Sequence, residues 1–525
     1  MNLIDEPWIE AIHKDGRRKP IRVTEITDPS LIDIHAPRAD FRGALYQFLI
    51  GLLQTAFAPS GNREWRQYWR EPPAAEALEE AFAPFRPAFE LIAPEGEPAF
   101  MQDLTLEEGE EREIAALLIE APGGNTIKNN QDHFIKRGGI DALSLPAAAM
   151  ALFTMQINAP SGGQGHRVSL RGGGPLTTLV MPPEEDGRDT LWRRLWMNVL
   201  TREEVGRLPG NHELQTQAAI FPWMGPTRTS EKKGQETYPE HAHPLQAYWS
   251  MPRRIRLAAF EEAGQCDLTG AQAQPLVREF VTRNYGVNYA GSWIHPLTPY
   301  AIEPDKEPLS IKGQPGGLGY RHWPGLVAIG KKGKATLEPA RVVQVYNDRF
   351  DLIDDADFEP RLWVFGYDMD NMKARCWYEA EMPLFNLGQE QREDLARQAQ
   401  QMIEVANDAL KNLKGALKRA WFKRPADIKG DLSFIDTNFW SSTEPGFYRG
   451  LHQIANHIDD IDAIDAQLRQ WRSLLKDAAL ELFDRYALSG LNEDGDLERV
   501  VKARDGKGGL VHSLNASKAM KALAA

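Results

Sequence analysis

Two aspartates separated by one residue, Asp368 and Asp370, are the first candidates for chemistry in this chain. Such a pair could bind a divalent cation, which could activate water or orient a phosphate. No histidine or further carboxylate follows at a fixed spacing, and Lys373 and Arg375 can neutralise the pair locally. Acidic turns of this kind are commonly hairpin connections, so we expect no metal, no cofactor and no catalysis here. A metal-dependent nucleic-acid enzyme using Asp368 and Asp370 is the alternative function.

The histidines and one glycine-lysine run give no stronger catalytic signal. His241 and His243 lack the partners that would complete a metal-binding motif, and His295 is expected to be a structural residue. Residues 325–332 nearly fit a phosphate-binding P-loop, but Lys332 stands where a serine or threonine would bind magnesium. The apolar residues around that run predict a hairpin with a basic tip instead, which argues against nucleotide hydrolysis.

Two glycine clusters, at 162–165 and 172–174, each lie close to an arginine, Arg167 or Arg171. Glycine permits positive φ and lets the backbone approach a partner closely, so amide groups rather than side chains could make the contact. The two arginines could hold a phosphate beside such a loop. On the residues alone, simple turns before a strand at 176–181, with solvated arginines, remain an equal alternative.

The run from 122 to 139 also has the composition of a contact loop. It holds amides that can read base edges, an aromatic ring that can stack on a base, and basic side chains that can hold phosphate. These residues are Asn129, Asn130, Gln131, Phe134, Lys136 and Arg137. A loop of this length without structure of its own is usually functional or disordered, so a flexible solvated loop is the alternative.

Composition limits the class of protein. The 525 residues are enough for two or more domains, and the hydrophobic content of 42% is that of a globular protein. No apolar run approaches the roughly 20 residues of a membrane span, and the chain starts without a signal peptide, so we expect a cytoplasmic protein. The isolated Cys266 and Cys376 argue against disulfides and zinc. The net charge of −13 argues against wholesale coating of DNA but permits a local contact.

Hydrophobic periodicity predicts an α+β protein. Residues 3–35 alternate as in a hairpin, and residues 38–57 have the spacing of a buried helix. A helix over 145–156 would lead into the first glycine cluster, so the two candidate loops flank one short helix and can lie side by side. We expect a large mixed α/β domain over residues 1–385 that carries the recognition loops.

From residue 388 onward the pattern is almost entirely helical. Apolar stripes at threes and fours predict a four-helix bundle over residues 386–525. Three lysines, Lys411, Lys414 and Lys418, share a face of its first helix. A solvated helical face is the usual explanation of such a run, although a guide-bound or displaced DNA strand could lie along it.

Several segments, in this order, resemble the CasA family, the large subunit of the type I-E CRISPR complex called Cascade. The segments are residues 2–9, 100–102, 159–178, 293–300 and 365–375, followed by a helical tail. The resemblance implies a non-catalytic antiviral subunit that recognises the protospacer-adjacent motif in double-stranded DNA and starts strand separation for guide-RNA pairing. It implies as partners the DNA target, guide RNA, the backbone and small Cascade subunits, and a nuclease-helicase, with no membrane. A purely scaffolding subunit would need neither candidate loop.

The resemblance also implies which residues contact DNA. Gly163, Gln164, Gly165 and Arg167 belong to the glycine loop, while Asn130, Phe134 and Lys136 belong to the loop before it. Arg283 is the candidate for a basic finger in the minor groove. Gln344, with Asn347 as second choice, is the candidate tip of a hairpin that wedges into the duplex, at a cost of a few kcal/mol per unstacked step. Apart from the resemblance, the charge pattern makes Lys414 and Lys418 the candidates on the basic helix face.

Overall fold

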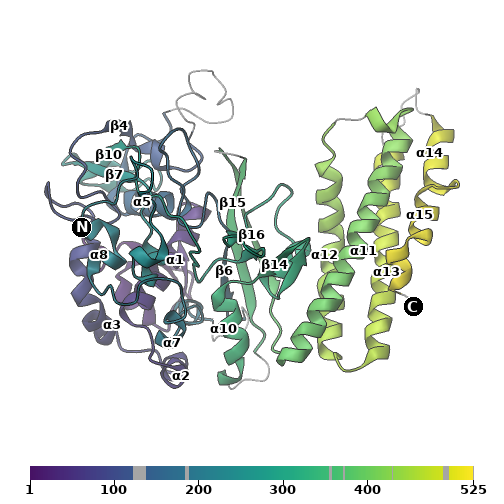
Figure 1. Cartoon of the computed structure of the whole chain (residues 1–525), viewed down its shortest axis with the longest axis horizontal. Helices are drawn as coiled ribbons and strands as arrows, with labels where there is room; N and C mark the ends of the chain where they lie inside the picture. Colours follow the sequence, from purple (N-terminus) through teal and green to yellow (C-terminus); the bar gives the residue numbers. More distant parts are fainter. Residues whose placement is uncertain are drawn as a thin grey trace. The chain divides into compact units, whose positions relative to one another are not determined.

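The computed structural model describes residues 1–121, 138–183, 189–353, 358–370, 373–427, 430–488 and 496–523. It divides the chain into two compact units (Figure 1). The first unit comprises Met1–Gly313 and Ala340–Glu379, and the second comprises Gln314–Pro339 and Ala380–Ala525. Helices and strands are both abundant, which confirms the predicted α+β class. The described part contains no helix with the length and apolar character that a membrane span requires.

The first unit begins with an antiparallel sheet in the order β2-β1-β3. Its strands are β1 (Ile9–His13), β2 (Arg18–Ile21) and β3 (Leu31–His35). The predicted hairpin is therefore present, and Gly16 supplies the positive φ that its turn needs. Helix α1 (Ala39–Ala56) follows, as the periodicity predicted, and almost all of it is buried.

An aromatic cluster around α1 forms the centre of the first unit. The ring of Phe48 on α1 packs edge-on against five other aromatic rings, with centroid distances of 5.4–5.9 Å. The five are Trp8, Phe89, Phe100, Phe153 and Trp249. Edge-to-face packing is a favoured arrangement of aromatic rings, so this cluster fixes α1 among segments far apart in sequence. The other helices that the structure describes in the first unit are α2 (Asn62–Arg70), α3 (Ala75–Phe82), α5 (Leu145–Asn158), α6 (Leu191–Trp196), α7 (Arg202–Val205), α8 (Gln217–Ile220) and α10 (Arg341–Arg349).

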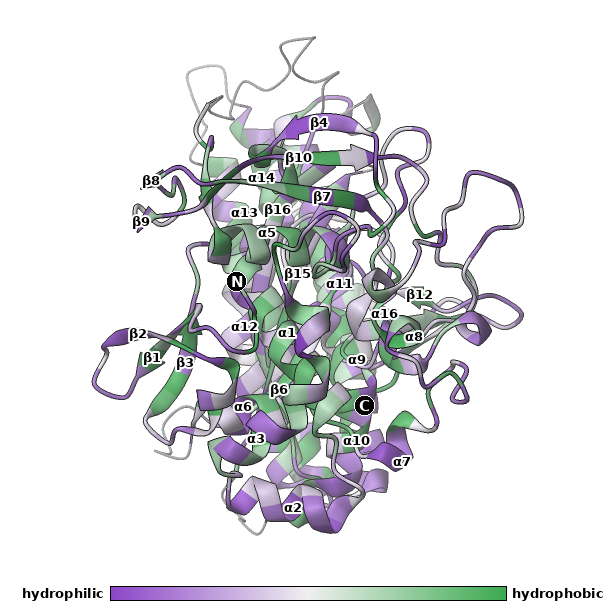
Figure 2. Cartoon of the chain, turned by 90° about the vertical axis from the view of Figure 1, so that its left-hand side faces the viewer, coloured by the Kyte–Doolittle hydropathy of each residue, from purple (hydrophilic) through white to green (hydrophobic). Residues whose placement is uncertain are grey.

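Two other sheets of the first unit position the glycine-rich segment. One joins β4 (Glu110–Glu113), β5 (Leu143–Ser144) and β7 (Arg254–Phe260) to β10 (Leu276–Arg283). Figure 2 shows β4, β10 and β7 side by side, with the hydrophilic β4 at the edge. The other sheet has the order β16-β15-β6. Its strands are β6 (Thr177–Met181), β15 (Arg361–Asp370) and β16 (Lys373–Pro383). Asp368 and Asp370 lie at the end of β15, which pairs with β16, as expected of an acidic hairpin turn.

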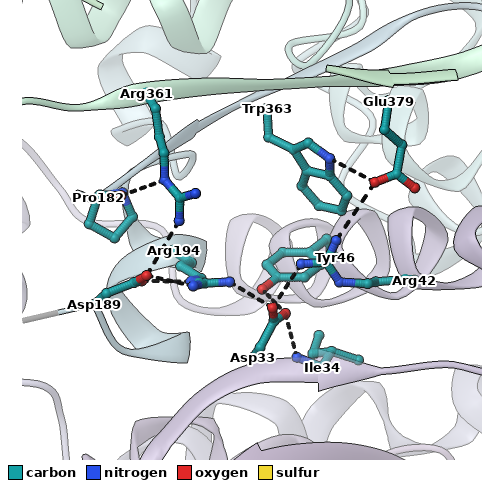
Figure 3. A network of polar contacts seen from close by, with 10 residues as sticks. All are labelled: Asp33, Ile34, Arg42, Tyr46, Pro182, Asp189, Arg194, Arg361, Trp363 and Glu379. Carbon is teal, nitrogen blue, oxygen red and sulfur yellow. Dashed lines mark hydrogen bonds and ion pairs between the residues drawn. The ribbon is translucent and has the colours of Figure 1, made fainter. Parts of the chain in front are cut away.

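A largely buried network of polar side chains joins β3, α1 and α6 (Figure 3). The carboxylate of Asp33 accepts hydrogen bonds from Tyr46 at 2.7 Å and Arg42 at 2.8 Å, and pairs with Arg194 at 2.8 Å. Arg194 also donates to Asp189 at 2.6 Å. Burial alone would raise the pKa of Asp33, but the charges of Arg194 and Arg42 outweigh it and hold that pKa below its ordinary value.

The second unit contains three long helices, α11 (Gln389–Trp421), α12 (Ser433–Asn456) and α13 (Ile461–Leu488). The fourth helix of the predicted bundle is broken into α14 (Leu497–Asp505), α15 (Leu510–Ala516) and α16 (Lys518–Ala522), each packed on α11. Glycines at 506, 508 and 509 separate the first two of these helices, and Ser517 caps the third.

Residues 314–339 also belong to the second unit, whereas the sequence predicted a single C-terminal stretch from residue 386. Tyr320 joins this segment to α12, because its ring stacks on Phe447 at 4.4 Å and its hydroxyl lies 2.9 Å from the hydroxyl of Thr443. The segment also contains α9 (Trp323–Leu326) and a hairpin of β13 (Gly330–Lys332) and β14 (Ala335–Glu338). The expected basic tip is therefore confirmed.

We predict that Asp33→Asn destabilises the protein by about 3–5 kcal/mol, because Arg42 and Arg194 would lose the charge that compensates them. Urea unfolding followed by tryptophan fluorescence measures the change. The contribution of Asp33 is present above the ordinary aspartate pKa of about 3.9 and is lost as the pH falls through the lower folded pKa. Asp15→Asn, in the exposed hairpin turn, is the control and should change the urea midpoint much less. Equal changes for both variants would contradict the prediction.

Candidate nucleic-acid interface

The first glycine cluster forms a tight turn directly after α5. The amide of His166 donates to the carbonyl of Gly163 at 3.1 Å. Gly165 has a φ of +80°, and a Cβ there would lie 2.9 Å from the Cβ of Asn284 and 3.1 Å from the ring of Tyr285. Both the backbone conformation and the lack of space therefore require glycine at position 165.

The other two glycines of this turn differ from each other. A Cβ on Gly162 would lie 2.6 Å from the Cβ of His166, so the absence of a side chain there makes room for the His166 ring. A Cβ on Gly163 would have no neighbour closer than 3.9 Å, and Gly163 and Gln164 are exposed. The turn therefore presents bare backbone to solvent at Gly163.

The turn is tied to the residues that follow β10. Tyr285 donates its amide to the carbonyl of Gly165 at 2.8 Å, and the side-chain amide of Asn284 donates to the carbonyl of Gln164 at 2.9 Å. Arg283, the last residue of β10, is 53% exposed and lies 3.7 Å from Glu231. The structure thus brings together two sequence-predicted site segments, the glycine loop and Arg283.

Arg167 has a structural part in this arrangement. Its Nε donates to the hydroxyl of Ser230 at 2.7 Å, and its Nη2 donates to the Ser230 carbonyl at 2.9 Å. The guanidinium also lies over the ring of Tyr285, 5.7 Å from the centroid. Arg167 therefore anchors the glycine loop, which sequence reasoning did not anticipate because Ser230 is 63 residues away.

The second glycine cluster faces the interior. A Cβ on Gly173 would lie 3.1 Å from the Cα of Pro160, and a Cβ on Gly174 would lie 2.3 Å from the Met369 side chain on β15. Gly172 and Gly174 also have positive φ. These glycines therefore allow close packing of the chain between Pro160 and β15, as turns before β6.

For Arg171 the sequence left open a phosphate ligand or a solvated side chain, and its burial in the structure fits neither. Its side chain is buried and donates only to neutral groups. One amino group donates to the hydroxyls of Thr177 at 2.9 Å and Thr298 at 3.1 Å, and the other donates to Gln47 at 2.9 Å and the Ile157 carbonyl at 3.2 Å. Burial lowers the pKa of Arg171 to about 10. The guanidinium therefore joins α1, the end of α5 and β6.

The predicted wedge residues are also placed differently. Gln344 and Asn347 lie on α10, not at the tip of a hairpin, and both are half-buried. The prediction of a hairpin here was wrong because a run of apolar residues between 342 and 346 fits a short buried helix as well as a strand. The side-chain oxygen Oε1 of Gln344 accepts a hydrogen bond from the guanidinium of Arg341, one turn earlier, at 3.3 Å.

Five further predicted contact residues belong to the second unit or lie outside the described part of the chain. Asn130, Phe134 and Lys136 are outside the described residues, as is most of the run from 122 to 139. Lys414 and Lys418 lie on α11 in the second unit. The ammonium of Lys414 pairs with Asp436 at 2.7 Å, so half of this basic pair is already neutralised.

The candidate catalytic groups are engaged in structural contacts. Asp368 is buried and receives two hydrogen bonds from Arg375, at 2.7 and 3.2 Å, while Asp370 lies 3.6 Å from the same guanidinium. Arg375 thus neutralises the pair as the sequence suggested. Burial, with the nearby charge of Arg171, lowers the pKa of His295 well below its ordinary value. The imidazole of His295 accepts a backbone hydrogen bond from Leu297 at 3.1 Å.

Comparisons with known proteins show a family match and similar folds over nearly the whole chain. The family model of the CRISPR-associated protein Cse1 matches residues 2–482. The fold is similar to that of CasA from Thermus thermophilus, with a TM-score of 0.70 at 19% identity over 98% of this chain and 100% of that one. Cse1 from Thermobifida fusca gives 0.71 at 17% identity over 100% and 97%. A chain of a CRISPR RNA-guided surveillance complex gives 0.60 at 14% identity over 100% and 99%.

We predict that Arg171→Leu lowers the free energy of unfolding by about 3 kcal/mol or more, because it leaves several buried acceptors without a donor. Arg171→Lys keeps the charge with fewer donors and should be intermediate. Urea unfolding measures the difference, and Arg17→Leu, whose side chain is 81% exposed in the first hairpin, is the matched control. If Arg171→Leu were as stable as Arg17→Leu, the inferred role of this side chain would be wrong.

Proposed function

The chain belongs to the CRISPR-associated Cse1 family, whose model matches residues 2–482, and we propose that it tests double-stranded DNA for a short flanking motif. Membership of this family supports the role of large subunit in a Cascade complex. In that role the protein recognises the protospacer-adjacent motif, starts strand separation for guide-RNA pairing, and recruits a nuclease-helicase. The likeness to a chain of an RNA-guided surveillance complex supports guide RNA and other Cascade subunits as partners.

The observation that carries the proposal is the bare backbone of the glycine loop. Gly163 is exposed, and no side chain stands between its backbone and an approaching surface. The loop is held by Asn284, Tyr285 and Arg167, so little conformational freedom is left to lose on binding. A firmly held backbone of this kind suits the minor groove of DNA. There, several base sequences present the same pattern of hydrogen-bond donors and acceptors.

Arg283 is the side chain best placed to hold a phosphate beside the loop. It immediately precedes Asn284 and is 53% exposed. Its contact with Glu231 is long, at 3.7 Å, and half exposed, so it contributes little and can be exchanged for a phosphate contact. Two of the five N–H groups of Arg167, in contrast, are committed to Ser230, so we assign Arg167 to holding the loop.

The proposed role requires no covalent chemistry from the chain. The two aspartates of the alternative enzyme share the guanidinium of Arg375, and one of them is buried. A metal ion at that position would have to displace an ion pair whose two hydrogen bonds are already satisfied. Strand separation remains part of the proposal through family membership, and not through Gln344, because a half-buried residue on α10 does not form the tip of a wedge.

We predict that Gly163→Ala weakens binding of target duplex by the assembled complex by about tenfold or more, because its methyl group would keep the groove away from the backbone. Gel shifts with duplexes that carry matched or altered flanking motifs measure the effect. The fold should be unchanged, since the new Cβ meets nothing closer than 3.9 Å. Gly430→Ala is the control, because its Cβ also meets nothing and it lies in the second unit. Normal duplex binding by Gly163→Ala would exclude backbone reading at this loop.

We predict that Arg283→Ala weakens duplex binding to a similar degree for all flanking motifs, because a phosphate contact carries no sequence information. Loss of one phosphate contact should reduce the slope of log affinity against log salt by about one. Arg278→Ala, on the same strand and with a side chain that is 36% exposed, is the control and should leave the slope unchanged. An unchanged slope for Arg283→Ala, or a loss confined to one motif, would be inconsistent with a phosphate contact.

A further inference from the structure

Arg253 lies against the glycine loop and has no part in the function proposed above. It stands one residue before β7, and its guanidinium reaches two residues of the loop. Nη2 donates to the carbonyl of Pro160 at 2.5 Å, and Nη1 contacts Nδ1 of His166. One cation therefore holds the loop both where it leaves α5 and at its closing residue.

The backbone of Arg253 is itself fixed by α5. The side-chain NH₂ group of Gln156 donates a hydrogen bond to the backbone carbonyl of Arg253 at 3.0 Å. The side-chain oxygen of Gln156 accepts one from the backbone N–H of Arg253, also at 3.0 Å. The same amide group of Gln156 also donates to the carbonyl of Met101 at 3.0 Å. Gln156 is buried, so the position of Arg253 relative to the end of α5 is rigidly determined.

The contact between Arg253 and His166 has a consequence for the protonation of the histidine. An arginine side chain has only donors and stays charged, so Nδ1 of His166 must be the acceptor. The imidazole is therefore neutral, with its proton on Nε2. Within the described residues, no carboxylate lies within ion-pairing distance of Arg253 to soften a second positive charge beside it.

Taken together, the charged groups on the elements around His166 also favour its neutral form. Arg253 faces it from the start of β7, and Arg112 and Glu110 face it from β4, where they pair with each other at 3.0 Å. His166 is exposed as a whole residue, but partial desolvation of its ring, together with the charges of Arg253 and Arg112, lowers its pKa more than Glu110 raises it. The neutral form that the hydrogen bond requires is thus the favoured one at neutral pH.

We propose that Arg253 and His166 are positioning residues for the glycine loop, and that a proton taken up at Nδ1 of His166 breaks their hydrogen bond and loosens the loop. This inference rests on the proposed function, because the loop is taken to read the duplex. The stabilisation is complete above the ordinary histidine pKa of about 6.5 and is lost as the pH falls through the lower folded value. Recognition of the duplex should therefore weaken in mild acid.

His166→Gln separates this mechanism from a simple structural role. The side-chain carbonyl of glutamine can accept from Arg253 at any pH, because it does not titrate in this range. Arg253→Met removes both hydrogen bonds and should loosen the loop at every pH, while Arg253→Lys keeps the charge and should restore part of the effect. His512→Gln, an exposed histidine on α15, is the control for general effects of losing a titratable group.

The first measurement uses the full chain alone. Hydrogen exchange of residues 160–168 is followed at pH 7.5 and pH 5.5 and corrected for the intrinsic pH dependence of exchange. The wild-type chain and His512→Gln should lose about tenfold of their protection in this segment at the lower pH, while His166→Gln should not. If His166→Gln loses protection as the wild type does, protonation of His166 is not the cause and the inference is overturned.

The second measurement uses the assembled complex and a target duplex over the same pH range. The affinity of the wild type should fall by about tenfold relative to that of His166→Gln, and Arg253→Met should be weak at both pH values. If the exchange data behave as expected but duplex affinity does not follow them, the pH-dependent contact is real and the loop does not read DNA. That outcome would overturn the proposed function and the role of the two residues in recognition.

Discussion

The guanidinium of Arg171 is a buried positive charge whose hydrogen bonds go to neutral oxygens, and four segments of the first unit converge on it. A charge without a compensating carboxylate is costly to bury, and it persists only where hydrogen bonds replace the water that it has lost. Here the acceptors come from Gln47 on α1, Ile157 at the end of α5, Thr177 on β6 and Thr298. Those elements cannot separate without leaving the charge unsatisfied. The position of the glycine loop, which starts where α5 ends, follows from this constraint.

The two glycine clusters look alike in the sequence and act in opposite ways. Gly173 and Gly174 lack side chains because Pro160 and Met369 occupy the space where a Cβ would stand. Gly163 lacks one although the space around it is open. Packing explains why Gly173 and Gly174 have no side chain. No neighbouring atom explains it for Gly163, so we attribute that glycine to contact with a molecule outside the chain.

Local patterns predicted the elements of the fold well. The first hairpin, α1, α5, the acidic turn after β15 and the helices of the second unit follow from hydrophobic spacing and turn residues, which act over a few positions. Membership of the family was inferred from short segments in a fixed order, and the match of the family model to residues 2–482 confirms it. Roles that depend on distant contacts could not be predicted in this way. Arg171 reads as a basic loop residue until Gln47 is known to lie beside it, and Gln344 reads as a strand residue until α10 is seen.

The second unit is composed of two separate stretches of the chain, and this affects the order in which the protein can fold during synthesis. Residues 314–339 leave the ribosome before Ala340–Glu379, which complete the first unit. Tyr320 must then wait for Phe447 and Thr443, the residues of α12 that it stacks on and bonds to. The polypeptide passes between the two units three times, at 313/314, 339/340 and 379/380. Neither unit can therefore complete its fold before part of the other has been synthesised. A nascent chain of which residues 1–400 have emerged from the ribosome would hold all of the first unit and a Tyr320 ring without its partners on α12, a state in which exposed hydrophobic surface favours chaperone binding.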